Sequence, residues 1–171
     1  RIANQLDPKV FDLSTLRFGG VSYGTRSWTP APDSSALDDT MDLERADGLQ
    51  LKIKASVSSS GLVTWHLASA DPFTGKLPED PFVGFLPPNA NGTEGQGVVY
   101  YEVALKSGVG NGAKVTNAAD IVFDLNEAIR TNTWSNLIDR DVPTASLSAP
   151  KTTGYSAIAV SWTVEDPTSG V

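Results

Sequence analysis

The chain has 171 residues, of which 40% are hydrophobic and 19% charged, enough for one domain or for a domain with part of another. Its formal net charge is −7, and an acidic surface repels phosphate backbones and anionic lipids, which argues against nucleic-acid and membrane-surface functions. The absence of cysteine excludes disulfides and thiolate chemistry, and no apolar run approaches the ~20 residues of a membrane-spanning helix, so membrane insertion is not expected.

Alternating apolar residues predict the first strands. Residues 11–21 are a weaker strand candidate that ends at the glycine pair 19–20. From residue 49 to residue 57 every second residue is apolar, and the alternation resumes at residues 62–68 after a Ser-Ser-Gly turn. These last two segments are predicted to form an antiparallel hairpin, with Trp65 on its apolar face.

A long stretch from Asp71 to Gly97 separates this hairpin from the next strands. It contains five prolines, which remove backbone donors and fix φ, so neither a strand nor a helix is expected there. Four apolar side chains within it are expected to cover part of the core: Phe73, Phe82, Phe85 and Leu86. We therefore predict a long, ordered, proline-rich loop that caps the fold.

A second pair of strands is predicted at residues 98–105 and 115–123, on either side of a glycine-rich break. Residues 124–129 have enough helical character for one short turn, and no segment shows the sustained apolar spacing of a helix. The sequence therefore predicts an all-β chain folded as an antiparallel, immunoglobulin-like β-sandwich.

Composition changes near residues 138–143, after which Ser, Ala and Thr predominate and a new strand pattern appears at residues 157–162. We predict a β-sandwich module at residues 1–141, followed at residues 142–171 by a linker and the first part of a second β-sandwich. Both ends look cut, so we expect the chain to be part of a longer polypeptide.

Several motifs resemble those of large bacterial extracellular repeat proteins. Residues 123–132 are similar to a Phe-Asp-x-Asn-x-x-Ile-x-Thr-Asn pattern, and residues 136–139 follow it as Asn-x-Ile-Asp. The resemblance extends to residues 71–75, 77–81, 84–89, 95–103 and 117–122. Residues 143–171 resemble the opening of a fibronectin-III or immunoglobulin-like module.

The resemblance implies a β-sandwich in a secreted or surface-attached, structural or adhesive setting, and it supplies no catalytic residues. In similar proteins the module begins earlier, which implies that this chain lacks its first strand or strands. A sandwich without one strand exposes an unpaired edge, which another chain or the missing piece would fill.

Residues with catalytic potential are few, and no enzymatic activity is expected. His66 is the only histidine, and its position opposite Trp65 on the strand indicates a surface or packing role. Spacing alone does not build the cleft that a pair of glycosidase carboxyls needs. The acidic groups considered for that role are Asp38, Asp39, Asp42 and Glu44, and the pair Glu79 and Asp80.

Calcium is the ion that the acidic loops would bind, because hard cations take carboxylate and carbonyl oxygens from flexible loops. The candidate ligands are Asp124, Asn126 and Glu127 after a strand, Asp139 and Asp141 at the module junction, and Asp71 and Asp80 in the proline-rich loop. None of them matches an EF-hand. The alternative interpretation is that these side chains bond their own backbone in turns.

We therefore expect a non-catalytic structural or adhesive module of a large extracellular bacterial protein, giving spacing and strand-edge association with other modules or copies of its parent. The alternative is an accessory module that binds carbohydrate or a calcium-dependent ligand beside a secreted enzyme, with polysaccharide as partner. Among the tryptophans, Trp65 and Trp162 are expected in the core, whereas Trp28 and Trp134 are candidates for exposed platforms.

Overall fold

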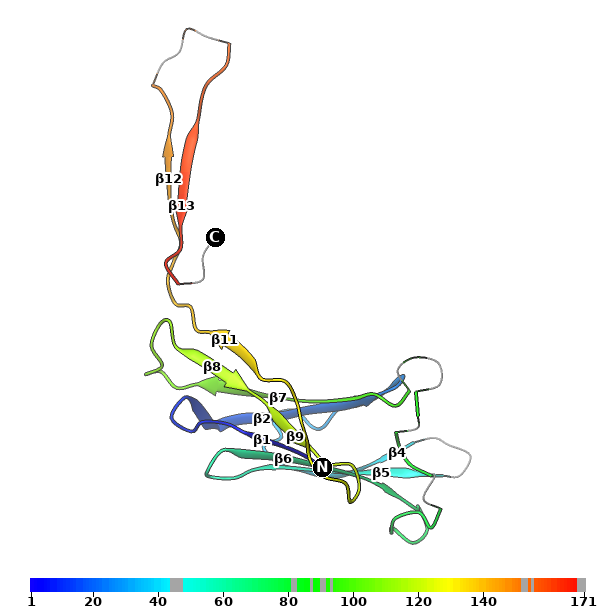
Figure 1. Ribbon diagram of the computed structural model, residues 1–171. Coiled ribbons are helices and arrows are strands. Elements are labelled where there is room, and N and C mark those ends of the chain that lie inside the picture. The colour runs from blue at the N-terminus through cyan, green and yellow to red at the C-terminus, as the bar shows by residue number, and fades with distance from the viewer. Residues whose placement is uncertain are drawn as a thin grey trace. The chain divides into compact units, whose positions relative to one another are not determined.

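The computed structural model describes residues 1–43, 48–80, 83–86, 88–89, 92, 94–151, 154 and 156–168. These residues form thirteen β-strands and no helix, which confirms the predicted all-β class (Figure 1); the described part of the chain accordingly has no helix able to cross a membrane. Two compact units are distinguished: the first comprises Arg1–Ser107 with Asn117–Thr133, and the second Gly108–Thr116 with Trp134–Val171. The predicted domain boundary at residues 141 and 142 stays a prediction.

Two antiparallel sheets make up the first unit. The large sheet has six strands, in the spatial order β10 (Ile129–Arg130), β9 (Ala119–Ile121), β1 (Ile2–Gln5), β6 (Leu62–Ala70), β5 (Gln50–Val57) and β4 (Leu37–Asp42). The small sheet has three, in the order β3 (Arg26–Trp28), β2 (Phe11–Tyr23) and β7 (Gly97–Leu105). Their apolar faces share one core, so the predicted antiparallel β-sandwich is confirmed.

The hairpin of β5 and β6 is the centre of the large sheet and forms as predicted. Val57 pairs with Val63 beside the turn, and the ladder continues to Gln50 opposite Ala70. Alternation sends Leu51 and Ile53 into the core, where both are fully buried. Trp65 is also fully buried and meets Phe18 of β2 edge-on, with ring centroids 5.2 Å apart.

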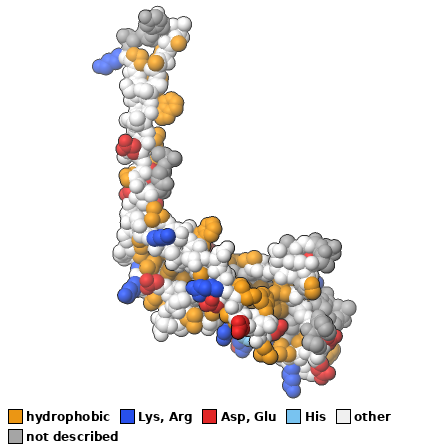
Figure 2. Space-filling view, viewed as in Figure 1, with side chains coloured by type: hydrophobic (Ala, Val, Ile, Leu, Met, Phe, Trp, Pro, Cys, Tyr) orange, Lys and Arg blue, Asp and Glu red, His pale blue; other side chains and the backbone are white. Residues whose placement is uncertain are grey.

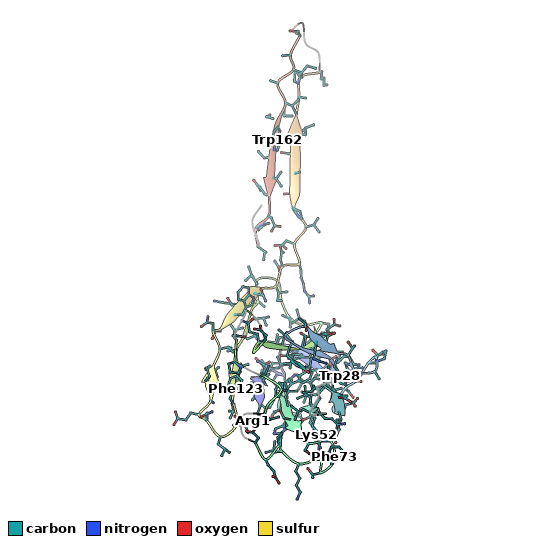
Figure 3. All side chains as sticks on the ribbon, turned by 90° about the vertical axis from the view of Figure 1, so that its right-hand side faces the viewer. Arg1, Trp28, Lys52, Phe73, Phe123 and Trp162 are labelled. Carbon is teal, nitrogen blue, oxygen red and sulfur yellow. The ribbon has the colours of Figure 1, made fainter. Side chains whose placement is uncertain are left out.

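The described part of the proline-rich loop contains no strand or helix up to residue 96, and Gly97 begins β7 (Gly97–Leu105). Phe85 and Leu86 pack against the core, as predicted, and Phe85 meets Tyr23 edge-on with ring centroids 5.9 Å apart. The prediction for Phe73 is wrong, because its side chain is 93% exposed; Figure 3 labels it. Phe82 lies outside the described residues, so the order of the whole loop stays a prediction.

The glycine pair 19–20 does not end a strand, because β2 continues to Tyr23. The register of β2 against β7 shifts between Phe18 and Val21, so the glycines form an irregularity within the strand. A Cβ at Gly19 would stand 2.0 Å from the ring of Tyr100. The absence of a side chain therefore lets the Tyr100 ring lie against the sheet.

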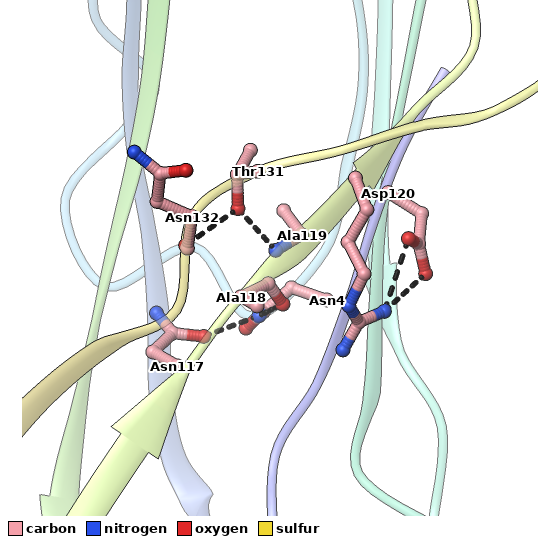
Figure 4. A network of polar contacts seen from close by, with 8 residues as sticks. Asn4, Asn117, Ala118, Ala119, Asp120, Thr131 and Asn132 are labelled. Carbon is pink, nitrogen blue, oxygen red and sulfur yellow. Dashed lines mark hydrogen bonds and ion pairs between the residues drawn. The ribbon is translucent and has the colours of Figure 1, made fainter.

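The strands predicted at residues 98–105 and 115–123 do form, but they do not pair with each other as predicted. Residues 98–105 belong to β7, which pairs with β2, and the predicted strand at residues 115–123 divides at Ala118 into β8 (Lys114–Asn117) and β9. The amide of Asn4 provides the physical reason, because its Nδ2 donates to the Asn117 side chain and, at 2.6 Å, to the Ala118 carbonyl oxygen (Figure 4). These bonds hold the backbone where it leaves one sheet and enters the other.

Two strand pairs lie in the second unit. β8 pairs with β11 (Trp134–Leu137), and β12 (Thr144–Ser148) forms an antiparallel hairpin with β13 (Ser161–Glu165). The strand predicted at residues 157–162 is thus displaced toward the C-terminus. Its partner β12 ends at Ser148, two residues before Pro150, which has no N–H to donate, so residues 157–160 have no ladder to join.

Candidate interaction surface

The first group of predicted calcium ligands lies in a tight turn after β9. Asp124 adopts a positive φ of 50°, and the backbone N–H and Nδ2 of Asn126 each donate to the Phe123 carbonyl oxygen at 2.9 Å. Glu127 is exposed. Residues 124–126 form a turn that the Asn126 amide closes, but the positive φ of Asp124 is not helical, so the helical character predicted at residues 124–129 is wrong.

Asp71 begins the proline-rich loop and closes a turn of its own backbone. Its Oδ1 accepts hydrogen bonds from the Phe73 N–H at 2.9 Å, and from the N–H and hydroxyl of Thr74 at 2.7 and 3.0 Å. The Thr74 bonds, with a smaller contribution from Phe73, hold the pKa of Asp71 below its ordinary value. The Asp80 carbonyl oxygen accepts a hydrogen bond from the Val83 N–H at 3.1 Å.

The junction carboxylates belong to a polar network inside the second unit. The Asp139 carboxylate accepts the Asp141 N–H at 2.8 Å, and the Asp141 carboxylate accepts the Asn111 Nδ2 at 2.8 Å and the Thr168 hydroxyl. The Asn111 Oδ1 accepts the Arg140 N–H at 2.6 Å. Sequence reasoning missed Asn111, although an asparagine in a glycine-rich turn is a typical backbone-bonding residue.

Protein donors therefore engage the carboxylates of three of the seven residues proposed as calcium ligands, namely Asp71, Asp139 and Asp141, and Asn126 uses its own amide as a donor. Among the described residues, no three His, Cys, Asp or Glu side chains gather as a metal site would require. Backbone carbonyls and amide oxygens also coordinate calcium, so calcium binding stays a prediction.

The acidic cluster considered for catalysis lies on an edge strand. Asp38, Asp39 and Asp42 all belong to β4, and Asp38 forms an ion pair of 3.0 Å with Lys54. His66 is exposed on β6, opposite Lys54. Glu44 lies outside the described residues. The expectation that the chain is not an enzyme stays a prediction.

The edge strands of the two sheets differ in length and charge. β3 and β10 are only three and two residues long. β4 is longer, but it carries three aspartates, of which Asp39 faces the core side because it pairs with the buried Ile53. Short strands and inward-pointing charges are devices that prevent edge-to-edge pairing.

β7 has none of these devices. It is nine residues long, and Glu102 is its only charged residue. Among the described strands it forms a ladder with β2 and with no other, so the backbone groups of its second side are free of strand partners. We call β7 the open edge.

The open edge faces the part of the large sheet that the small sheet does not cover. The Tyr101 hydroxyl of β7 donates to the Asn4 side chain of β1, whereas Phe18 of β2 packs on Trp65 of β6. The strands of the two sheets are therefore stacked in the same order, so that β2 faces β6 and β7 faces β1. Beyond β1 come β9 and β10, and no described strand of the small sheet lies beyond β7.

Apolar residues continue across the large sheet into this uncovered part. The row of cross-strand partners runs from Trp65 through Ile2 and Ile121 to Ile129, all on the core side. Exposure rises along the row from 1% at Trp65, through intermediate values, to 59% at Ile129. Ile2, Ile121 and Ile129 are called the open face. Phe123, which follows two residues after Ile121 and is labelled in Figure 3, is also exposed.

A second apolar surface lies on the β12–β13 hairpin. Ala145 pairs with Val164 and Leu147 with Trp162, so these four residues share one face, while the other face is polar. Trp162 is 70% exposed, which overturns the prediction that it lies in a core. Figure 2 shows hydrophobic side chains at the surface of this hairpin. Trp134 is exposed as anticipated, whereas Trp28 packs against the core.

Residues 83–137 match the model of a family described as a domain of unknown function (DUF7619). The matched segment covers less than half of the chain and includes β7 to β11, and therefore the open edge and most of the open face. No curated protein and no solved structure matches the chain. The family description assigns no function, so function is argued from the surface itself.

Proposed function

We propose that this chain is a non-catalytic structural or adhesive module of a large extracellular bacterial protein, and that it associates with neighbouring modules or copies through a strand edge. The observation that carries the proposal is the open edge: nine residues, one charge, and a ladder on one side only. An edge of this kind is a template for another strand.

The contrast between β7 and β4 supports association at a defined place. β4 carries three aspartates in six residues and so resists pairing. Selection against aggregation acts on every exposed edge, and an edge of nine residues with a single charge is consistent with regular occupation by a partner. The proposed role in spacing neighbouring modules is supported by the same architecture, since a sandwich with a close-packed core is a rigid unit between its neighbours.

The extracellular setting rests on composition and on the motif resemblance. Cysteine is absent, and charged residues make up only 19% of the chain, so polarity depends on Ser, Thr, Asn, Gln and Gly. Such composition suits short strands and turns in a protein outside the cytoplasm.

Sedimentation velocity over a range of chain concentrations tests the proposal. We expect reversible self-association, because at high concentration a second copy takes the place of the natural neighbour. Ala104→Asp gives the exposed side of β7 the acidic character of β4 and should weaken association several-fold. Ser56→Asp places the same charge at an exposed position of the interior strand β5 and is the matched control.

A chain that remains monomeric at every concentration and binds a bacterial cell-wall polysaccharide with saturation would contradict the proposal. That result would favour the carbohydrate-binding alternative. The melting temperature of the chain, measured with calcium and with a chelator, tests the calcium prediction.

A further inference from the structure

We propose that the partner of the open edge is an extended strand in which every second side chain is apolar, and that this strand adds beside β7 and covers the open face. The inference rests on the proposed function and specifies its partner. Two independent features carry it, namely the free backbone of β7 and the uncovered apolar row beyond β1.

The backbone of β7 requires an extended partner. A strand can satisfy a row of alternating N–H and C=O groups because its own groups repeat with the same spacing, whereas a helix uses its backbone groups internally. β7 is nine residues long, so a partner of similar length could pair along all of it. A sugar or a metal ion has no group pattern that matches such a ladder.

The open face determines the side chains of that partner. An added strand lies about 4.8 Å beyond β7, which takes it from above β1 to above β9 and β10. Beneath it would be Ile121 and Ile129, which continue the row of cross-strand partners that begins at the buried Trp65 and passes through Ile2. Side chains that point from the partner toward these two isoleucines must be apolar to gain by burial.

The other side of the added strand remains in solvent. On that side β7 presents Val98, Tyr100, Glu102 and Ala104. Asp120 and Arg130 form an ion pair of 3.0 Å (Figure 4). Because they alternate with Ile121 and Ile129 along β9 and β10, they are on the opposite face of the large sheet. The place of the added strand is therefore apolar on its inner side and open to solvent on its outer side, so only every second side chain of the partner needs to be apolar.

A synthetic peptide provides the probe. It has the length of β7, alternates valine with threonine, and carries lysines at both ends for solubility. We expect saturable binding to the 171-residue chain by isothermal titration. Two peptides serve as controls: one of the same composition with the alternation scrambled, and one with alternate backbone nitrogens methylated so that one edge cannot donate. Both should bind at least about tenfold more weakly.

A pair of matched variants locates the site. Ile129→Ser removes an apolar side chain of the open face, and we expect about tenfold weaker peptide binding. Val98→Ser is the control, since Val98 is equally exposed, at 59%, but points to the opposite side of the small sheet. Peptide binding by Val98→Ser should stay within about twofold of the unmodified chain. The exposure of both residues keeps each variant folded, which circular dichroism verifies.

Equal binding of the alternating, scrambled and methylated peptides would overturn the inference, as would an effect of Val98→Ser equal to that of Ile129→Ser. Self-association of the chain without any peptide binding would also overturn it, while leaving the proposed function in place. Absence of both self-association and peptide binding would overturn the inference and the proposed function together.

Discussion

At the scale of single residues, Asn4 fixes the relation between β7 and the large sheet. Asn4 is the one buried polar side chain among the described residues. Its Oδ1 accepts the Tyr101 hydroxyl, while its Nδ2 donates to Asn117 and Ala118. A buried amide is stable only when its donors and acceptor are satisfied, so this set of bonds specifies one arrangement of three segments.

Removal of the Tyr101 hydroxyl leaves the Asn4 Oδ1 buried without its donor. We expect Tyr101→Phe to lower the free energy of unfolding by about 1–3 kcal/mol, as measured by urea denaturation. Tyr100→Phe on the same strand is the control, because the Tyr100 ring lies on the exposed side, and its effect should stay below about 0.5 kcal/mol. Equal effects of the two substitutions would refute the assigned role of Asn4.

Tyr101 also predicts a response to alkaline pH. Burial raises the pKa of its phenol, against a smaller lowering effect of the Asn117 side chain. A raised pKa means that folding favours the neutral phenol, so its contribution to stability is complete below the ordinary pKa of tyrosine. That contribution is lost as pH rises from there through the folded-state pKa.

The stability difference between the unmodified chain and Tyr101→Phe should therefore shrink with increasing pH in that alkaline range. Urea titrations at a series of pH values measure it. A difference that stays constant, or grows, across the range would show that the Tyr101 phenol is not held neutral by the fold.

At the scale of elements, the sandwich has two long edge strands: β4 is protected against pairing with another strand by its charges, and β7 is not. Asp39 on β4 places a charge on the core side of its edge, opposite Ile53. We expect Asp39→Val to create a second associating edge and to raise the order of oligomer seen by sedimentation. Asp38→Val is the matched control, since Asp38 points to the outer face and pairs with Lys54. Identical behaviour of both variants would contradict the role given to Asp39.

Local alternation was sufficient to predict the β5–β6 hairpin and its buried residues, because a hairpin is fixed by adjacent sequence and a short turn. It was insufficient for β7, whose partner β2 lies far earlier in the chain. The division at Ala118 depends on Asn4, which is equally remote in sequence. Trp162 has the alternation of a core residue, but no described strand covers its face.

The residues proposed as calcium ligands show the same limit of prediction from local sequence. Asp71 and Asn126 were singled out for calcium from residue type and loop position, and each closes a turn of its own backbone. The open edge follows from strand order, which spacing along the chain does not encode. The only signal available in the sequence was the scarcity of charge in residues 97–105 compared with residues 37–42.

At the scale of the whole molecule, each unit carries an apolar β-surface that its own described strands leave exposed. In the first unit it is the open face beside β7, and in the second it is the Trp162 side of the β12–β13 hairpin. Two-layer packing requires a partner for such faces. The proposed adhesive or structural function follows from these unmatched surfaces.

Residue-resolved amide hydrogen exchange at low and high chain concentration tests the central claim most directly, because it reports which strand gains hydrogen bonds on association. We predict that the amides of β7 pointing away from β2 exchange quickly in the dilute chain and become protected as copies associate, while those at the outer edge of β4 do not change. Protection confined to the β12–β13 hairpin, or β7 amides fully protected in the dilute monomer, would contradict the assignment of β7 as the associating edge.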